Sequence, residues 1–541
     1  MQPTKKASPT SLLHEELLWN IFLEITNDAL VYPWQIEHRP IIVIRRCSHV
    51  CGRWRSVILS SSTIWGRLID LDYFHKQKTD DWMKEVVSRT GSALLWVYGI
   101  VGHYQDARNH FLSTFLQENW RRIQGLVVSD RLFSTLEQRQ KMWAFLRQPA
   151  PRLRWADLMF DFEYMDELLP RLLFADNAPL LTDFRIRNEY KFSTDALWIS
   201  NLCVVTFGFE FHPSEVLEAL QRMPRLEYLQ VYIGHGAADY RGPTIILPKL
   251  RMLQFQARGF LDAGTFLQRI APSGADCCLF AAVYLLEPTV PFPDNGEYLN
   301  EYEAVVAKHF MPYSSLHLPT VVTFAVTDDI FTLGFGGQGF VPGHPAAPER
   351  QVHYITLHTP SLPSSLLMEK FYSSAWFSRV TELDFGTWYF SFDFNQLEIV
   401  PTLSSFSSLK TFSTNDVILH ALLRLPSSLT ATLFPVLTTL QMSNPNTPQP
   451  RTDSEEPPHH RFLQFRKVIG RPLSVFEISF PKPHMDVESP SYNMEYLEVH
   501  SGLLFRWKIA GEGPEQYRCY RCGDGHPERL RFNLANPLTI S

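Results

Sequence analysis

The sequence predicts an α/β fold in which an N-terminal helical module is followed by a solenoid of strand–helix repeats. The first observation is a short motif, Pro-x-Leu-x-x-Leu-x-apolar, which begins at Pro224 and again 24 residues later at Pro248. The second is that amphipathic helical stretches lie between copies of the motif. The third is a pair of short amphipathic helices within residues 12–70.

The motif ends in Leu-x-apolar, which is the alternation of a short strand with one buried face. Copies that keep the proline begin at Pro179, Pro224, Pro248, Pro319 and Pro435. Looser copies lie at Val204/Phe207/Phe209, Val380/Leu383/Phe385 and Leu409/Phe412, with others near Leu153/Leu158, Ile355/Leu357, Val475/Ile478/Phe480 and Tyr496/Leu497/Val499. Each copy is predicted to form one strand.

Helical stretches flank these strands. One spans 214–222, with Ser214 as its expected N-cap, and another spans 262–270. A single strand–helix unit cannot bury its apolar face, whereas stacked units can, and each shared Leu or Phe then contributes about 1.5–3 kcal/mol. The strands are therefore expected to form a parallel sheet on one curved face, with the helices on the other.

The repeat between about Pro151 and Val499 resembles leucine-rich repeats, whose units have this length. The asparagine that is usual in that family is mostly absent from the copies. The alternative is an ordinary α/β domain whose strands happen to be similar.

The N-terminal module has apolar residues at helical spacing at both of its ends. In the first helix one face carries Leu13, Leu17, Ile21 and Ile25, with Leu18 and Phe22 beside it, and in the last helix the face carries Val50, Trp54, Val57 and Ile58. Two such helices bury little surface by themselves, so part of this apolar area is expected to need a partner.

These residues resemble an F-box, whose pattern is Leu-Pro-x-Glu-Leu-Leu-x-x-Ile-Phe, a middle helix, Val-Cys-x-x-Trp and a late apolar-Trp pair. The matching positions are Leu13, Glu16 (or Glu15), Leu17, Leu18, Ile21, Phe22, Val50, Cys51, Trp54, Ile64 and Trp65. The resemblance implies a three-helix module that docks onto a Skp-type adaptor of a cullin–RING ubiquitin ligase.

The candidate adaptor-binding residues are Leu13, Leu17, Leu18, Ile21, Phe22, Val50, Cys51 and Trp54. Some of them must pack internally, and Trp54 is the best candidate for both roles because tryptophan offers the most area. Two features depart from the family. His14 replaces its proline, and Asn27 to Pro40 is an insert predicted to be a loop. The alternative is a helical cap that binds nothing.

Composition narrows the classes of function. The 541 residues are 45% hydrophobic and 20% charged, which is globular, and the net charge of −6 without a basic block argues against nucleic acid. Seven scattered cysteines indicate a reducing compartment rather than a disulfide framework. No apolar stretch is long enough to span a bilayer, so we expect no membrane association and a location in the cytoplasm or nucleus.

Catalytic and cofactor motifs are scarce. Gly334 to Gly339 fits a dinucleotide pattern by letter, but Pro342 follows where a helix is needed, so a loop is expected. Cys519 and Cys522, with His526 behind them, have the spacing of half a zinc site, and the other half would have to come from His459, His460 or His500. We therefore expect no cofactor and no enzymatic activity.

The predicted organisation is a loose tail at 1–11, the F-box-like module at 12–70, a junction with the first repeats at 71–150, the solenoid at 151–510 and a C-terminal tail at 511–541. Two loops, Gly334 to Arg350 and Ser443 to His460, interrupt the solenoid. The expected function is substrate recognition for the ligase, through strand-side residues such as Glu227, Gln230, Arg251 and Gln254. The alternatives are a repeat scaffold outside any ligase and, last, a metal-dependent enzyme.

Overall fold

The computed structural model describes residues 13–27, 39–75, 81–101, 114–130, 136–160, 169, 171–187, 190–237, 240–272, 277–283, 295–316, 320–326, 330–335, 353–358, 377–386, 399–443, 456–480, 491–509 and 517–533. The chain forms two compact units. Unit 1 contains residues 1–257, 265–277 and 341–348, and unit 2 contains residues 258–264, 278–340 and 349–541.

Unit 1 begins with short helices. They are α1 (Glu15–Asn27), α2 (Pro40–Cys47), α3 (Gly52–Ser60) and α4 (Ser62–Gly66), so the predicted three-helix region contains a further short helix. Pro40 was expected in a loop but is the first residue of α2, where its fixed φ suits a helix start. Asn27 was also expected in that loop but is the last residue of α1. Residues 28–38 of the insert lie outside the described residues, as does the predicted tail at 1–11.

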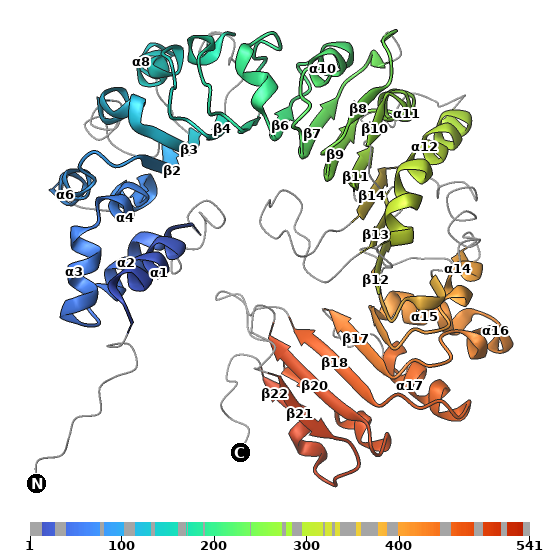
Figure 1. Ribbon diagram of the computed structural model, residues 1–541. Coiled ribbons are helices and arrows are strands. Elements are labelled where there is room, and N and C mark those ends of the chain that lie inside the picture. Colours follow the sequence, from blue (N-terminus) through green and yellow to red (C-terminus); the bar gives the residue numbers. More distant parts are fainter. Residues whose placement is uncertain are drawn as a thin grey trace, which may run out of the picture. The chain divides into compact units, whose positions relative to one another are not determined.

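The strands of unit 1 form one parallel ladder, which confirms the predicted sheet in this part of the chain (Figure 1). Its members, in spatial order, are β1 (Ile69–Asp70), β2 (Leu95–Val101), β3 (Ile123–Asp130), β4 (Trp155–Phe160), β5 (Asp183–Arg187), β6 (Val204–Phe207), β7 (Tyr228–Ile233) and β9 (Met252–Ala257). β2 and β3 are two rungs that the proline motif does not mark.

Helices and 3-10 turns connect these strands and lie along one side of the ladder (Figure 1). They are α5 (Leu71–His75), α6 (Asp81–Arg89), η4 (Trp120–Arg122), α8 (Leu136–Trp143), η5 (Ala144–Arg147), η6 (Leu173–Asp176), η7 (Leu197–Asn201) and α10 (Pro213–Leu220). The short strands β8 (Ile245–Leu247) and β10 (Ile270–Pro272) pair in parallel, and α11 (Phe260–Gln268) follows β9.

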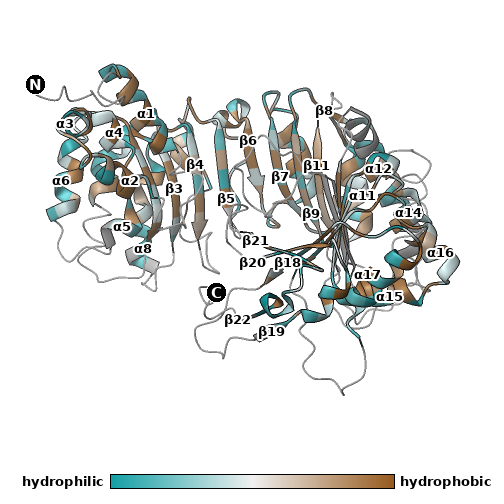
Figure 2. Ribbon diagram, turned by 90° about the horizontal axis from the view of Figure 1, so that it is seen from below, coloured by the Kyte–Doolittle hydropathy of each residue, from teal (hydrophilic) through white to brown (hydrophobic). Residues whose placement is uncertain are grey.

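The alternation of buried and partly exposed residues along the strands shows on which side of the sheet the core lies. In β4 and β7 every second residue is buried on the helix side, and Figure 2 shows hydrophobic and hydrophilic colours alternating along these strands. Aromatic rings fill the helix side. The ring of Trp198, for example, lies 5.0 Å from that of Phe184 and 5.7 Å from that of Phe174. The opposite face of the strands is left to partly exposed side chains.

The expected cap of the 214–222 helix was wrong by two residues. His212 is the N-cap of α10, because its ring accepts a hydrogen bond from the backbone N–H of Ser214 and Pro213 occupies the first helical position. Glu215 accepts a hydrogen bond from the His212 N–H at 3.0 Å and completes a capping box.

Unit 2 also has a parallel ladder, formed by β12 (Val321–Val326), β15 (Glu382–Gly386), β16 (Thr411–Thr414), β17 (Thr439–Ser443), β18 (Val475–Phe480) and β20 (Leu504–Ile509). The sheet is not parallel throughout. β13 (Ile330–Phe335) runs antiparallel between β12 and β14 (His353–His358), and β14 pairs in parallel with β11 (Cys278–Val283).

The other elements of unit 2 are α12 (Asn295–Leu316), η9 (Phe377–Arg379), α14 (Ile399–Ser405), α15 (Asp416–Arg424), α16 (Ser427–Thr432), α17 (Pro458–Val468), β19 (Ser491–Asn493), η11 (Glu495–Val499), β21 (Arg518–Arg521), η13 (Pro527–Leu530) and β22 (Arg531–Asn533). Helices α15, α16 and α17 lie on one side of strands β17, β18 and β20 (Figure 1).

Four expectations about unit 2 were wrong. Tyr496, Leu497 and Val499 form η11 rather than a strand, and the next rung is β20. Gly334 belongs to β13 rather than to a loop, while 336–350 lies outside the described residues.

His459 and His460 lie in helix α17, although they were assigned to a loop whose middle, 444–455, is not described. The predicted C-terminal tail contains β21, antiparallel to β20, and β22, antiparallel to β19. Within the described residues, no helix combines the length and apolarity needed to cross a bilayer.

Candidate protein-binding sites

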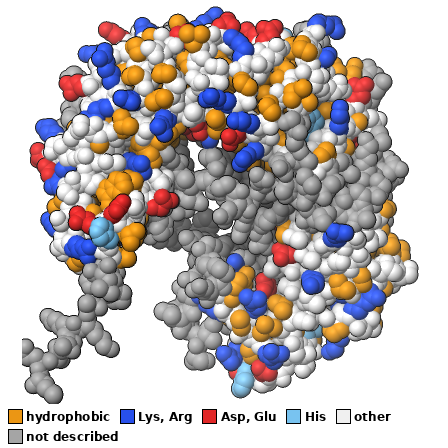
Figure 3. Space-filling model, in the orientation of Figure 1, with side chains coloured by type: hydrophobic (Ala, Val, Ile, Leu, Met, Phe, Trp, Pro, Cys, Tyr) orange, Lys and Arg blue, Asp and Glu red, His pale blue; other side chains and the backbone are white. Residues whose placement is uncertain are grey.

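The N-terminal region exposes three large apolar side chains, which we call the apolar patch: Leu17 and Ile21 on α1, and Val50 in the turn before α3. These side chains are 52%, 47% and 62% exposed. Leu17 and Ile21 are four residues apart on α1 and therefore share one face of the helix. Figure 3 shows hydrophobic side chains gathered over the region of α1, with acidic side chains beside them.

The structure separates the eight candidate residues by exposure. Leu18 and Phe22 are fully buried and hold α1 to its neighbours. Leu13 and Trp54 are half-buried, and the Trp54 ring meets the Phe22 ring edge-on at 5.3 Å. Cys51 is exposed beside the patch. Trp54 thus contacts the core and keeps part of its surface open, whereas Leu18 and Phe22 cannot touch a partner without local unfolding.

Hydrogen bonds fix the helices that carry the patch. The Trp19 indole N–H donates to Ser61 Oγ at 2.9 Å, and the Trp65 indole N–H donates to the Ile58 carbonyl at 2.8 Å. His14 is exposed, and its Nδ1 accepts a hydrogen bond from the Glu16 N–H at 3.4 Å. His14 therefore caps the first turn of α1 by a hydrogen bond, which proline cannot do.

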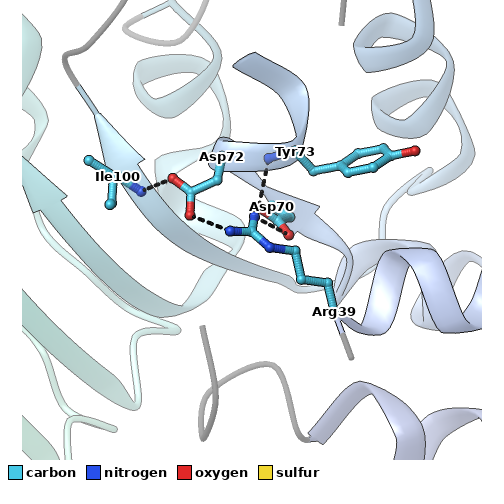
Figure 4. Close-up of polar contacts among 5 residues, drawn as sticks. All are labelled: Arg39, Asp70, Asp72, Tyr73 and Ile100. Atoms are coloured by element: carbon cyan, nitrogen blue, oxygen red, sulfur yellow. Dashed lines mark hydrogen bonds and ion pairs between the residues drawn. The ribbon is translucent and has the colours of Figure 1, made fainter. Parts of the chain in front are cut away.

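A buried ion-pair network joins these helices to the first strands (Figure 4). Arg39, just before α2, donates from Nη1 to Asp70 Oδ1 at 2.8 Å and from Nη2 to Asp72 Oδ2 at 3.0 Å. Asp70 also accepts from the Tyr73 N–H at 3.0 Å, and Asp72 accepts from the Ile100 N–H at 2.7 Å. This network was not predicted from the sequence, because Arg39 fell in the predicted loop.

The network is buried and is not a pair of surface charges. The Arg39 and Asp70 side chains are only 7% and 1% exposed. Burial raises the pKa of Asp70 to about 6, although the Arg39 guanidinium works in the opposite direction. The Tyr98 phenol beside these carboxylates is buried, and burial raises its pKa well above the ordinary value. Removing the guanidinium would therefore leave buried negative charge without compensation.

A second candidate surface lies on the strand face of unit 1. The Arg67 guanidinium lies 4.1 Å from the centroid of the Trp96 ring, and Trp96 meets Trp155 edge-on at 4.8 Å. Further along, Arg185 lies 5.4 Å from the centroid of the Tyr228 ring, and the Tyr228 hydroxyl donates to Gln254 Oε1 at 2.5 Å. We call the face that these residues share the strand-face strip.

The four strand-side residues named from the sequence fall in different places. Gln254 lies in the strip and is largely buried, and Gln230 lies next to it on β7, where its side chain bonds Tyr232 at 2.7 Å and Thr206 at 3.2 Å. Glu227 and Arg251 come just before β7 and β9 and lie at the strand ends instead.

The zinc candidates are not assembled into a metal site in the described residues, which contain no group of three or more His, Cys, Asp or Glu able to hold a metal. Cys519 is exposed on β21, while Cys522 is buried, and burial raises the pKa of its thiol to about 12. His526 Nδ1 lies 3.2 Å from Glu528 Oε1.

The three histidines considered as further ligands form a structural cluster. His459 Nδ1 lies 2.8 Å from Asp416 Oδ1, and its Nε2 lies 2.5 Å from the Tyr496 hydroxyl. His460 Nδ1 lies 3.1 Å from His500 Nε2. Burial lowers the pKa of His460 and lowers that of His500 to about 4, so both rings are neutral near pH 7. The cluster ties α15, α17 and η11 together.

Comparison with known proteins gives little. No protein-family model matches the sequence, and no curated protein matches it. Among solved structures, the leucine-rich repeat-containing protein LegL7 from Legionella pneumophila is similar, with 10% identity and a TM-score of 0.23 over 70% of this chain and 91% of that chain. Similarity at that level supports no argument about function, so the repeat architecture rests on the strand ladders described above.

Proposed function

We propose that this chain is the substrate-recognition subunit of a Skp–cullin–F-box type ubiquitin ligase. The N-terminal helices would bind the Skp-type adaptor, and the strand face of the repeats would bind a target protein, in the cytoplasm or nucleus. The observation that carries the proposal is the exposure of Leu17 and Ile21 together on a helix that is held in place by the fully buried Leu18 and Phe22.

The energetic reason is the apolar surface of the patch. Complete burial of a Leu or Ile side chain contributes about 1.5–3 kcal/mol, and these two are about half exposed, so a partner could gain roughly 1 kcal/mol from each before Val50 is added. Exposed neighbouring aliphatics in a fixed orientation are typical of protein-binding sites. The chain itself would contribute proximity between the ligase and its target rather than chemistry.

The test is a double substitution, Leu17→Asp with Ile21→Asp, followed by co-purification with a Skp-type adaptor. Because both side chains are exposed, we expect the variant to keep its thermal stability while losing the adaptor. The matched control is Leu197→Asp with Val468→Asp, which places the same charges at apolar positions that are 75% and 84% exposed elsewhere. Loss of adaptor binding in the control as well, or binding that persists in the test variant, would contradict the proposal.

His14 gives the second candidate function a specific basis, since the family's proline is replaced at the start of α1. Under this alternative, the chain is a repeat scaffold whose helices do not bind a ligase. Wild-type protein that captures other proteins reproducibly but no Skp-type adaptor would favour it. A His14→Pro variant that gains adaptor binding would identify this residue as the cause.

A further inference from the structure

The last strands of unit 2 carry basic side chains on the face of the sheet that points away from the helices. Strands β18, β20 and β21 are neighbours in this sheet (Figure 1). The buried residues of β18 face the helices, since the Phe476 ring lies 5.5 Å from the His459 ring of α17. Strand alternation therefore places Glu477 of β18 and its register neighbour Arg506 of β20 on the opposite face, together with Lys508.

Strand β21 adds a third cation to this face. Arg521 is exposed and is the register neighbour of Leu504, whereas Tyr520 beside it is buried on the helix side. We call Arg506, Lys508 and Arg521 the basic cluster. Among the described residues of β18, β20 and β21 that share this face, three are cations and one, Glu477, is an anion, so the face has an excess of two positive charges.

The cluster is held in place by its neighbours. The Arg506 guanidinium lies 4.5 Å from the centroid of the Tyr517 ring, and Lys508 Nζ lies 4.8 Å from the same centroid. Arg506 Nη1 also lies 2.6 Å from Glu477 Oε1, and Gln441 Nε2 donates to Glu477 Oε2 at 2.9 Å. These contacts restrict the rotamers of partly exposed side chains, which lowers the entropy cost of binding a ligand.

The positive charge of the cluster is only partly compensated. Glu477 balances Arg506, whereas neither Lys508 nor Arg521 forms an ion pair in the part of the chain that the structure describes. Two like charges, on Arg506 and Lys508, lie against one ring, so a bound anion would relieve the repulsion between them.

The spacing of the cations matches an extended chain. Arg521 is level with Leu504, which comes two residues before Arg506 and four before Lys508. The cations therefore follow one another along the strand direction at intervals of two residues, or about 7 Å. Side chains on alternate residues of an extended segment point to the same side and have the same spacing.

We propose that the basic cluster binds an extended segment of a partner protein that has Asp or Glu at alternate positions. This inference rests on the proposed function, because it names the chemistry of the target that the strand face of the repeats would recognise. Proteins that bind nucleic acid neutralise many phosphates, and three cations on a chain with a net charge of −6 fit a short acidic segment better.

The experiment measures binding of labelled Gly-Ser peptides to the full chain by fluorescence anisotropy. One peptide has three glutamates at alternate positions, a second has three consecutive glutamates, and a third has three lysines at alternate positions. The first two peptides have equal charge and differ only in spacing. We expect the alternating glutamate peptide to bind about threefold more tightly than the consecutive one, because the middle of three consecutive side chains points away from the sheet. The lysine peptide should not bind.

The test variant, Lys508→Gln/Arg521→Gln, removes the two cations that lack ion pairs and keeps the pair between Arg506 and Glu477. It should bind the alternating glutamate peptide about tenfold more weakly, and Lys508→Gln alone about threefold more weakly. The matched control is Lys410→Gln/Arg461→Gln, which removes the same charge from exposed positions just before β16 and on α17. The control should change the affinity by less than about twofold.

The proposal is overturned if the wild-type chain binds no glutamate peptide, if it binds both glutamate peptides equally, or if the control loses as much affinity as the test variant. A labelled single-stranded oligonucleotide that binds more tightly than either glutamate peptide, and is lost in the test variant, would also overturn it in favour of a nucleic-acid partner. The Leu17→Asp/Ile21→Asp variant should bind the alternating glutamate peptide normally, and the Lys508→Gln/Arg521→Gln variant should keep the adaptor. The two proposals can therefore fail separately.

Discussion

Replacement of Arg39 by methionine should destabilise unit 1 by about 3–5 kcal/mol, the usual cost of breaking a buried ion pair by removing one partner. The guanidinium donates to both Asp70 and Asp72, so its loss leaves two carboxylates facing each other in a site from which water is largely excluded. Methionine keeps a similar volume, and the packing around α2 should be retained. Domains are stable by only about 5–15 kcal/mol, so the change is a large fraction of the total.

The effect should depend on pH, with a sign set by Asp70. Burial raises its pKa to about 6, whereas the unfolded chain has the ordinary value near 3.9. The folded protein therefore binds the proton more tightly, and the contribution of Asp70 to the free energy of unfolding is greatest below pH 4 and falls as the pH rises through 6. The wild-type decline is about 3 kcal/mol. Without the Arg39 guanidinium the pKa rises further, so the decline is larger and extends to higher pH.

The assay is urea unfolding, followed by tryptophan fluorescence, at pH 5 and pH 8 for the wild type, Arg39→Met and Arg39→Met/Asp70→Asn. The single variant should lose much more stability at pH 8 than at pH 5. The double variant should recover most of it, because an uncharged pair of similar size replaces the ion pair. A single variant within 1 kcal/mol of the wild type at pH 8, or a double variant that is no more stable than the single one, would refute the reasoning.

Two further predictions concern a glycine and the thiols. Gly99 has φ +124°, and a Cβ there would lie 3.0 Å from the Asp72 backbone nitrogen, so Gly99→Ala should cost about 2–3 kcal/mol in thermal unfolding. Gly259→Ala, where a Cβ meets nothing within 4 Å, should be close to neutral, and equal melting temperatures for the two variants would contradict the steric account. Iodoacetamide at pH 8 should label Cys51 and Cys519 in the native chain but not Cys278 or Cys522, which mass spectrometry would detect; rapid native labelling of Cys522 would show that its thiol is not buried.

The repeat strands could be predicted because their signal is local. At Pro224 and Pro248 a proline turn and an alternating apolar pattern fall within eight residues, and β7 and β9 follow at the expected positions. β11 lacks that signal, because all of its residues are buried and the sequence shows no alternation. β13 is antiparallel and belongs to no repeat, so a repeat template could not place it.

The N-terminal patch could be predicted only as a group of apolar residues. Leu17 and Leu18 differ by one position on the same helix, and which of them is buried depends on where α2 and α3 pack against α1. The Arg39 network was out of reach for a related reason. Its partners lie 31 and 33 residues away in the sequence, and ion pairing at such a distance has no local pattern.

The network also bears on how the proposed function would work. A subunit that acts by proximity must hold its two binding sites at a constant distance, since motion between them would dilute the effective concentration of the target. Within unit 1, Arg39 fixes the start of α2 to β1 and α5. Arg67, the C-cap of α4, reaches the Trp96 ring at the first end of the strand-face strip. The helices that carry the apolar patch and the strands that carry the strip are thus joined by two arginines rather than by a linker. The Arg39→Met substitution should therefore reduce modification of the target even where the adaptor and the target each still bind.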